Sequence, residues 1–338
     1  MPRHARLVLA ALVAGGTPAL GGCESLMVMT GLRMRLDGVP LQAVAASMPG
    51  DGRLAPGAQA TLSVIATTTD GRTLASAGTG DGKVLLDSYA FEASGGASVD
   101  ADGVVRLPAD PRLTEGRVPH VRIPPAGQPG PVTELDIPIR YDVPFETAFA
   151  GPPGWDGSAG ADGSEGATGA SGSSDPANPS PGGNGGNGGP GGNGEDGGTG
   201  GPGPDVQVRV ALAPGDHPLL HVRTIATGEK DRYFIVDPQG GSLALTVSGG
   251  RGGSGGLAGR GGAGGAGGPG MPPGAPGSPG FDGLAGHDGW GGPAGHVAIE
   301  VDPAAAAYVD RLQVTNVDGN GRPGTPPSVA IGPVPAPW

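Results

Sequence analysis

Residues 182–205 read GGNGGNGGPGGNGEDGGTGGPGPD, with glycine at every third position for about eight triplets. Three further stretches, 151–174, 249–272 and 274–297, keep the same period, and the four are named here, in chain order, the first to fourth glycine tracts. A repeat of three residues per turn is that of an extended left-handed helix, and a bare Cα in every turn lets neighbouring helices touch backbone to backbone. The tracts are therefore predicted to be structural elements and not a catalytic site.

The second and third tracts mostly place a second glycine beside the first. That second glycine opens another face to close approach, which favours lateral polyglycine II packing through N–H···O=C and Cα–H···O contacts. Collagen prefers imino acids at those positions and needs three chains, whereas Gly- and Ser-rich sequence commonly behaves as flexible coil. We expect a polyglycine II bundle, with a disordered stalk and a collagen-like homotrimer as alternatives. The first tract, with other residues at most remaining positions, is the one expected to behave differently.

The joints between tracts predict how a bundle would be arranged. The non-repeating segment 175–181 and the phase slip at 271–274 both resemble reversals, so the tracts should run up-down-up-down, each roughly 75 Å long if unbroken. Trp155 and Trp290 would then lie near the base, partly buried against the β domains. The glycines predicted to be structural are Gly182, Gly185, Gly188, Gly191, Gly194, Gly197, Gly200, Gly274, Gly277, Gly280, Gly283, Gly286 and Gly289.

The GGN, GGP, GGT and GGA triplets resemble those of the glycine-bundle proteins, such as the snow-flea antifreeze protein and certain phage-tail adhesins. The resemblance covers about a third of the chain and is compositional. It implies a fold and not a shared ligand.

Outside the tracts the chain alternates apolar and polar residues with the period of a β-strand. The region 32–148 has several short strands with turns such as Asp70-Gly71 and Asp102-Gly103, which suggests a β-sandwich. Residues 97–105 resemble a strand and turn of bacterial immunoglobulin-like domains. Two further β regions, 206–248 and 297–338, are each too small to be stable alone, so we expect them to pair as one domain interrupted by the repeats at 249–296. The predicted fold class is mainly β, with the repeats of 149–205 and 249–296 forming the bundle.

The N-terminus carries a targeting signal. A basic head precedes an apolar run, and the segment ends at Leu20-Gly21-Gly22-Cys23, which matches the lipobox of bacterial lipoproteins. The resemblance implies that residues 1–22 are a signal peptide, that Cys23 becomes lipidated, and that 23–31 is a tether. Glu24 after the cysteine favours the outer membrane, facing the periplasm or the cell surface.

The sequence contains few residues in patterns typical of catalytic or metal-binding sites. His120, His217, His221, His287 and His296 lack metal-ligand spacing, and residues 191–196 begin a calcium-binding nonapeptide pattern that fails at Gly198. Residues 318–321, DGNG, could ligate calcium but are also two turn signals in a row. The formal net charge of −12 and the lack of a basic stripe argue against nucleic acid. No catalytic constellation, metal site or cofactor is predicted.

These observations predict a non-enzymatic, lipid-anchored surface protein that acts as a structural spacer or adhesion module. Its partners would be the membrane, through the lipid, and a surface protein, matrix or glycan. The alternative function is ligand binding, to a glycan or an inorganic surface, on a flat side of the bundle. The mixture of Asn, Pro, Thr, Ala, Arg and Asp along the tracts favours the structural role.

Overall fold

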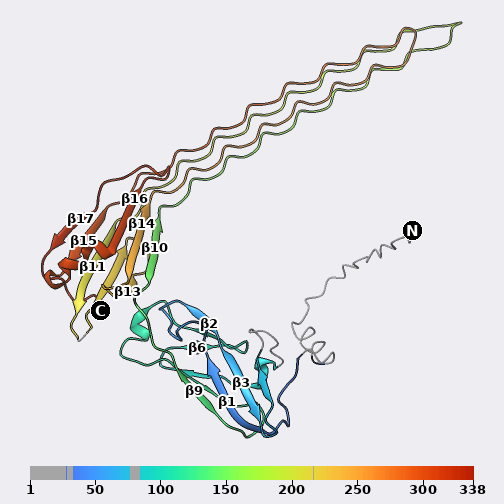
Figure 1. The fold of residues 1–338 in the computed structure, drawn as a ribbon. Helices are drawn as coiled ribbons and strands as arrows, with labels where there is room; N and C mark the ends of the chain where they lie inside the picture. Colours follow the sequence, from blue (N-terminus) through green and yellow to red (C-terminus); the bar gives the residue numbers. More distant parts are fainter. Residues whose placement is uncertain (1–27, 29–32, 77–83, 216) are drawn as a thin grey trace, which may run out of the picture. The chain divides into compact units, whose positions relative to one another are not determined.

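A computed structural model describes residues 28, 33–76, 84–215 and 217–338 (Figure 1). The signal peptide, Cys23 and the start of the first β region at Leu32 lie outside the described residues. The chain divides into two compact units, Met1–Arg140 and Tyr141–Trp338. In the described part of the chain the regular elements are strands and short 3-10 helices, so the mainly-β fold class is confirmed.

The first unit contains three small sheets, ordered β1-β3-β4, β2-β7-β6 and β5-β8-β9, all antiparallel. Glycine turns join several strands, and Gly71 and Gly103 adopt φ of 86° and 68°, which other residues rarely adopt. The elements are β1 (Leu41–Ser47), β2 (Gln59–Thr61), β3 (Ser63–Thr68), β4 (Thr73–Ala75), η1 (Leu86–Ser88), β5 (Glu92–Ser94), β6 (Ser98–Val99), β7 (Val104–Arg106), η2 (Pro111–Leu113), β8 (His120–Ile123) and β9 (Thr133–Asp136).

The core of this unit follows from period-two alternation. On β3, Val64 and Ala66 are fully buried while Ile65 between them is exposed, because successive side chains of a strand point to opposite faces. The same core contains Val105, Val121 and other apolar residues from each of the three sheets. Tyr89 is buried with them, and within the described residues its hydroxyl has no hydrogen-bond partner. Burial raises the pKa of Tyr89 to about 12.

The second unit packs two sheets against each other. One is five-stranded, in the order β13-β12-β11-β15-β17, and the other is the parallel sheet β10-β14-β16. Their apolar faces share one core, and η3 packs against it through Ala305, Tyr308 and Val309. The elements are β10 (Pro144–Ala150), β11 (Val206–Ala213), β12 (Leu219–Ala226), β13 (Arg232–Val236), β14 (Ser242–Ser248), β15 (Val297–Val301), η3 (Pro303–Arg311), β16 (Leu312–Val317) and β17 (Ser328–Ile331).

Strand pairing in this unit joins segments that are distant in the sequence. Strand β11 pairs in parallel with β15, and β14 with β16, so residues 206–248 and 297–338 share both sheets. Strand β10 also belongs here, because it pairs with β14 from Pro144–Ser242 to Ala150–Ser248. The boundary between the units therefore falls after Arg140 and not after 148 as the sequence indicated.

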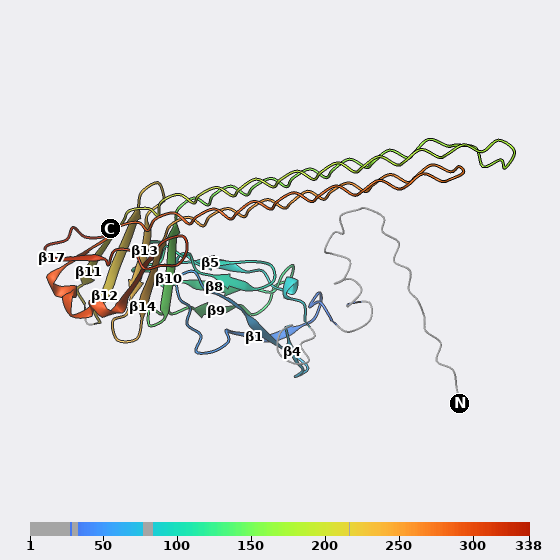
Figure 2. The ribbon, with the colours of Figure 1, turned by 90° about the horizontal axis from the view of Figure 1, so that it is seen from above.

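Each glycine tract continues a strand without an intervening loop (Figures 1 and 2). The parallel pair β10 and β14 runs directly into the first and third tracts, and the second and fourth tracts run into the parallel pair β11 and β15. Gly151 N–H donates to Ser248 O, and Val206 N–H donates to His296 O, so the strand pairing passes into the tracts in register. The two sheets thus extend as two layers of tracts.

The four tracts lie side by side, joined by backbone hydrogen bonds of 2.7–3.0 Å that repeat every third residue. First-tract glycines donate to the third tract, as Gly160 does to Leu257, and neighbours that follow one another in the chain run in opposite directions. The second tract bonds to the first, third and fourth tracts, and the third to the first, second and fourth. No backbone hydrogen bond joins the first tract to the fourth, both of which are fully described. We call this four-tract assembly the glycine bundle.

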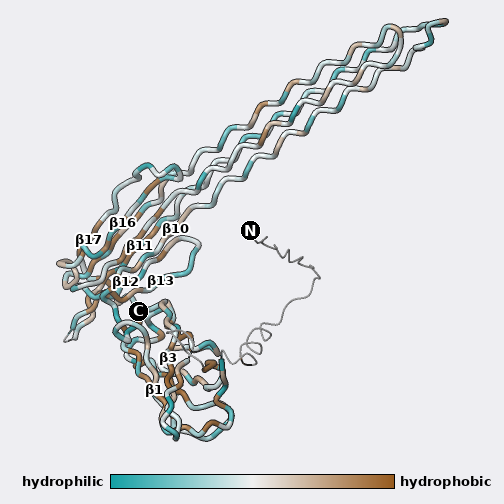
Figure 3. The backbone as a smooth tube through the Cα atoms, turned by 45° about the vertical axis from the view of Figure 1, so that its right-hand side comes forward, coloured by the Kyte–Doolittle hydropathy of each residue, from teal (hydrophilic) through white to brown (hydrophobic). Residues whose placement is uncertain are grey.

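Glycine content matches the number of neighbours. The second and third tracts, with two glycines in most triplets, occupy the centre, and each leaves one position per triplet exposed. The first and fourth tracts, with one glycine per triplet, occupy the outer corners and leave two positions exposed. Figure 3 shows the consequence in hydropathy: brown gathers in the sheets, while the tracts are mostly pale with separate brown and teal segments.

Candidate ligand-binding face

The exposed rows of side chains give the bundle two distinct faces. Three residues per turn place every third side chain on the same side of a tract. The middle residues of the first-tract triplets lie beside the second tract, since a Cβ on Gly201 would meet the Pro152 ring at 2.6 Å and one on Gly189 would meet Ser164 Oγ at 2.7 Å. The last residues of those triplets lie beside the third tract, where Asp162 Oδ1 accepts the Arg260 N–H.

The fourth tract divides in the same way. Its middle residues border the exposed row of the second tract, and the ring of His287 reaches Asp196 at 3.3 Å. Its last residues border the third tract, where Asp282 Oδ1 accepts the Gly261 N–H at 2.7 Å. The face around the second tract, called here the aromatic face, comprises three rows: Pro152, Trp155, Ser158, Ala161, Ser164, Ala167 and Ala170; Asn184, Asn187, Pro190, Asn193, Asp196, Thr199 and Pro202; and Ala275, Ser278, Phe281, Leu284, His287, Trp290 and Pro293.

Most of the exposed large apolar side chains of the bundle lie on the aromatic face. Trp155 is 73% exposed, Trp290 71%, Leu284 73% and Phe281 87%. The expectation that the two tryptophans would be partly buried is therefore wrong, although both lie near the base, where Gly198 and Gly200 N–H donate to their carbonyls. Both occupy middle positions of corner tracts, which border the second tract but leave most of the indole surface open to solvent.

The two tryptophans lie at nearly the same level of the bundle, on either side of the second tract. Gly198 N–H donates to Trp155 O, and Gly200 N–H donates to Trp290 O, so the two carbonyls are bonded two residues apart along the second tract. The Trp155 indole covers Gly198, where an added Cβ would stand 2.4 Å from the ring. One side of this ring is thus supported by backbone while most of its surface stays open.

Asparagine and aspartate side chains tie the second tract to the fourth. Asn187 Oδ1 accepts the Ser278 N–H at 2.9 Å, and Asn193 Oδ1 accepts the Leu284 N–H at 2.8 Å. Asp196 Oδ1 accepts the His287 N–H at 2.7 Å, and this backbone bond, followed by the His287 ring, lowers the pKa of Asp196. These bonds satisfy outward N–H groups that no neighbouring backbone reaches.

The aromatic face leads at its base into an open pocket of ≈ 650 Å³. The member of each row that is nearest the base, Pro152, Pro202 or Pro293, lines this pocket, together with Asp205, Thr227, Glu229 and His296. Asp205 Oδ1 lies 3.2 Å from His296 Nδ1, which fixes both side chains at the pocket wall. An adjoining pocket of ≈ 540 Å³ shares Asp205, Thr227 and His296.

The face around the third tract is charged. Its central row contains Arg251 and Arg260, and the flanking rows contain Asp156, Asp162, Glu165, Asp282 and Asp288. Asp156 and Asp288 accept the N–H groups of consecutive residues, Ser254 and Gly255, from opposite sides of the tract. These carboxylates therefore have the same structural role as the asparagines of the aromatic face.

The predicted structural glycines all lie at contacts between tracts. In the second tract Gly182 donates to Pro272 O, and the others donate to the fourth tract, as Gly188 does to Ser278. Those of the fourth tract donate to the third, as Gly280 does to Gly262. The glycines of the first and third tracts, which the prediction left out, make equivalent bonds, as Gly163 does to Arg260. A Cβ on Gly163 would meet Gly189 O at 2.1 Å, so the first tract does not behave differently in this respect.

The other residues considered for chemistry have structural partners. Asp318 Oδ1 accepts the N–H groups of Asn320 and Arg322, and Gly319 N–H donates to Gly292 O, so this loop docks on the base of the bundle. His120 and His217 each pair with an aspartate, and His221 stacks on Trp338 with ring centroids 4.4 Å apart. Among the described residues no group of three or more His, Cys, Asp or Glu side chains could hold a metal ion. Within the same residues no helix is long and apolar enough to cross a membrane.

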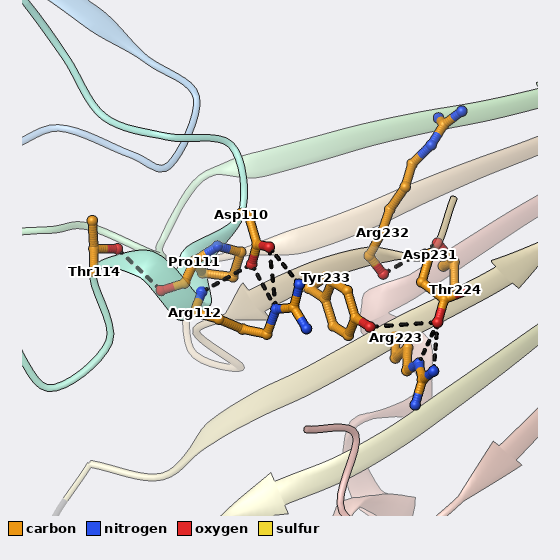
Figure 4. A network of polar contacts seen from close by, with 9 residues as sticks. All are labelled: Asp110, Pro111, Arg112, Thr114, Arg223, Thr224, Asp231, Arg232 and Tyr233. Atoms are coloured by element: carbon orange, nitrogen blue, oxygen red, sulfur yellow. Dashed lines mark hydrogen bonds and ion pairs between the residues drawn. The ribbon is translucent and has the colours of Figure 1, made fainter. Parts of the chain in front are cut away.

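Charged side chains elsewhere in the two units stabilise local structure (Figure 4). In the second unit Arg223 Nε donates to Asp231 Oδ2 at 2.9 Å, and the Tyr233 hydroxyl donates to the same oxygen at 3.4 Å. In the first unit Asp110 caps η2, where its Oδ1 accepts the Arg112 N–H at 3.1 Å. Neither group adjoins a pocket described above.

The aromatic face with its basal pocket is therefore the candidate site, and its signal in the sequence was the spacing of large apolar residues at one triplet position of the fourth tract. No protein-family model, curated protein or solved structure matches this chain.

Proposed function

We propose that this chain is a non-enzymatic, lipid-anchored surface protein in which a polyglycine II bundle serves as a rigid spacer and adhesion module. The observation that carries the proposal is the repeating set of backbone hydrogen bonds that joins the four tracts of a single chain. Because each tract is held by its neighbours, side chains are needed only on the outside, where they are free to meet a partner. This also favours a bundle over a collagen-like trimer, which would need two further chains to satisfy its glycine N–H groups.

The anchor belongs to the proposal as well. Leu20-Gly21-Gly22-Cys23 supports lipidation of Cys23 and placement in the outer membrane, facing the periplasm or the cell surface. The 33–140 region would be an immunoglobulin-like spacer, which its small antiparallel sheets and single apolar core favour. A second function, ligand binding on a flat side of the bundle, is favoured by the exposed tryptophans.

Circular dichroism of the full chain with a thermal melt tests the bundle. A rod held by cooperative hydrogen bonds should lose its extended-helix signal in one transition and resist proteolysis within 151–205 and 249–296. A gradual, non-cooperative change together with rapid cleavage at the tracts would show that they are a disordered stalk.

Membrane fractionation tests the anchor. The Cys23→Ser variant should remain unprocessed and leave the outer-membrane fraction. If it still fractionates with the outer membrane, the lipid anchor is wrong, whatever the state of the bundle.

A further inference from the structure

We propose that the aromatic face binds a neutral polysaccharide, laid along the bundle axis, with Trp155 and Trp290 as stacking platforms. The inference rests on the proposed function, because it needs a folded bundle that displays this face. It names the chemistry of the partner that the face would hold.

The tryptophans provide the stacking surface. One face of a pyranose ring consists mainly of C–H groups, and these pack against the electron-rich face of an indole. Trp155 lies over the bare backbone of Gly198 and is nevertheless 73% exposed, so its ring is supported from below and open above. Trp290 is on the other side of the second-tract row and is 71% exposed. Exposed apolar residues scattered singly need no explanation, but these two lie on one face, and Pro152 and Pro293, one triplet nearer the base in the same rows, line a pocket.

The fourth tract extends this surface in a line. Phe281, Leu284, His287 and Trp290 occupy successive triplets, so neighbouring side chains repeat about every 9 Å and the row spans roughly 28 Å. A linear polymer of sugar rings is a partner that can follow such a row. Beside it, Asn187 and Asn193 have their Oδ1 atoms bound to backbone, and their NH₂ groups make no hydrogen bond within the described residues. These groups and the Thr199 hydroxyl are suited to sugar hydroxyls.

Charge selects a neutral polymer. The aromatic face carries Asp196 in its central row, Glu195 is bonded through its N–H to Ser158 O, one triplet from Trp155, and Asp205 and Glu229 line the basal pocket. No Lys or Arg belongs to the three rows, and the two arginines of the bundle, Arg251 and Arg260, lie on the other face. An acidic glycan, a phosphate-bearing lipid or a second copy of this acidic face would meet like charge. Carboxylates can instead accept hydrogen bonds from neutral sugar hydroxyls.

The pattern of the face also favours a glycan over a protein. Protein interfaces have a contiguous, closely packed apolar centre. Here the polar central row separates Trp155 from the apolar residues of the fourth tract. Stacking on separate rings, with hydrogen bonds between them, fits this arrangement better.

Affinity electrophoresis of the full chain, in native gels cast with single polysaccharides, tests the inference. The neutral probes are hydroxyethyl cellulose, xyloglucan, mannan, a β-1,3-glucan and dextran, and the acidic probes are alginate and polygalacturonate. We expect retardation by at least one neutral polymer and by neither acidic polymer. In the double variant Trp155→Ala/Trp290→Ala the apparent dissociation constant should rise at least tenfold.

Leu257→Ala, which removes an exposed apolar side chain from the charged face, is the matched control and should bind as the unaltered chain does. A thermal melt of each variant separates the two proposals, because a cooperative melt without any retardation overturns the glycan inference and leaves the bundle intact. Equal binding by the double variant, or retardation only by acidic polymers, also overturns it. So does a tryptophan-dependent association with phosphatidylcholine vesicles, a protein or a second copy, detected by cosedimentation, when no neutral polymer retards the chain.

Discussion

At Gly188 a single added carbon would stand 2.0 Å from the carbonyl oxygen of Gly262, which is far inside van der Waals contact. The obstacle is backbone held by its own hydrogen bonds, so it cannot move aside as a side chain would. Gly188→Val should therefore lower the stability of the bundle by at least about 1–3 kcal/mol, the usual cost of overpacking. A lower melting temperature and new protease cleavage near 188 are expected. Thr168→Val, at an exposed position of the first tract, should change neither, and equal effects of the two variants would contradict this packing.

Burial of Tyr89 makes the stability of the first unit depend on pH. Its folded-state pKa is raised to about 12 by burial, above the usual value of 10.0. The unfolded chain therefore loses this proton first, so the stabilisation is fully present below pH ~10 and is lost as pH rises toward 12. The loss is on the order of 2–3 kcal/mol at high pH. Denaturant unfolding of the first unit at pH 9 and near pH 12 measures it.

Tyr89→Phe is the matched variant for that measurement. Since the hydroxyl has no partner among the described residues, its removal should leave stability at neutral pH unchanged or slightly higher. The part of the pH-dependent loss that is due to Tyr89 should disappear. An unchanged loss in the variant would mean that other groups cause it.

At the scale of the elements, side-chain to backbone hydrogen bonds join the second tract to the fourth at successive triplets. Removing one of them tests whether these bonds hold the two tracts in register. Asn193→Ala leaves the Leu284 N–H without its acceptor and should cost about 0.5–1.5 kcal/mol. Hydrogen exchange at the Leu284 amide should accelerate. Asn193→Asp keeps an acceptor oxygen and should retain protection, and equally fast exchange in both variants would show that the bond does not hold this edge.

The elements also show what sequence could predict. Period-three glycine marks the tracts because a Cα without a side chain is required wherever two backbones meet, and the doubled glycine of the second and third tracts corresponds to their extra contacts. The strand regions 206–248 and 297–338 were likewise visible in period-two alternation. The end of the first β region was not, because the alternation of 135–143 crosses Arg140 without any change of composition.

The candidate face could be predicted only in part, from the large apolar residues Phe281, Leu284 and Trp290 at one triplet position of the fourth tract, for a related reason. The sequence of a single tract reveals only its three-residue period. Which rows of side chains lie side by side depends on the register between packed tracts. Trp155 and Trp290 lie on the same face because Gly198 N–H donates to Trp155 O and Gly200 N–H donates to Trp290 O. No sequence pattern specifies these two hydrogen bonds. Their exposure has the same origin, since the outward direction of a middle position follows from where the neighbouring tracts lie.

For the molecule as a whole, a distance across the bundle tests its order. Glu195 N–H donates to Ser158 O, and Gly197 N–H donates to His287 O, which places Ser158 and His287 within two residues of each other along the second tract. Spin labels at these two positions should give one narrow distance of roughly 20 Å or less. The same labels in denaturant provide the reference for an unfolded chain. A broad distribution centred beyond about 50 Å in the native protein would exclude the bundle, since flexible tracts separate the labels widely.

Every tract continues a strand at one end and meets a reversal at the other. The length of the glycine bundle can therefore change only by whole triplets. Adding one triplet to one tract would shift its contacts by about 9 Å against the two or three neighbouring tracts that have not lengthened. Adding a triplet to all four tracts at the same level would reproduce every bond and move the tip outward by one step. Growth or shortening of the bundle, in evolution or by design, therefore proceeds in coordinated sets of twelve residues. The two sheets at its base would not have to change when its length changes.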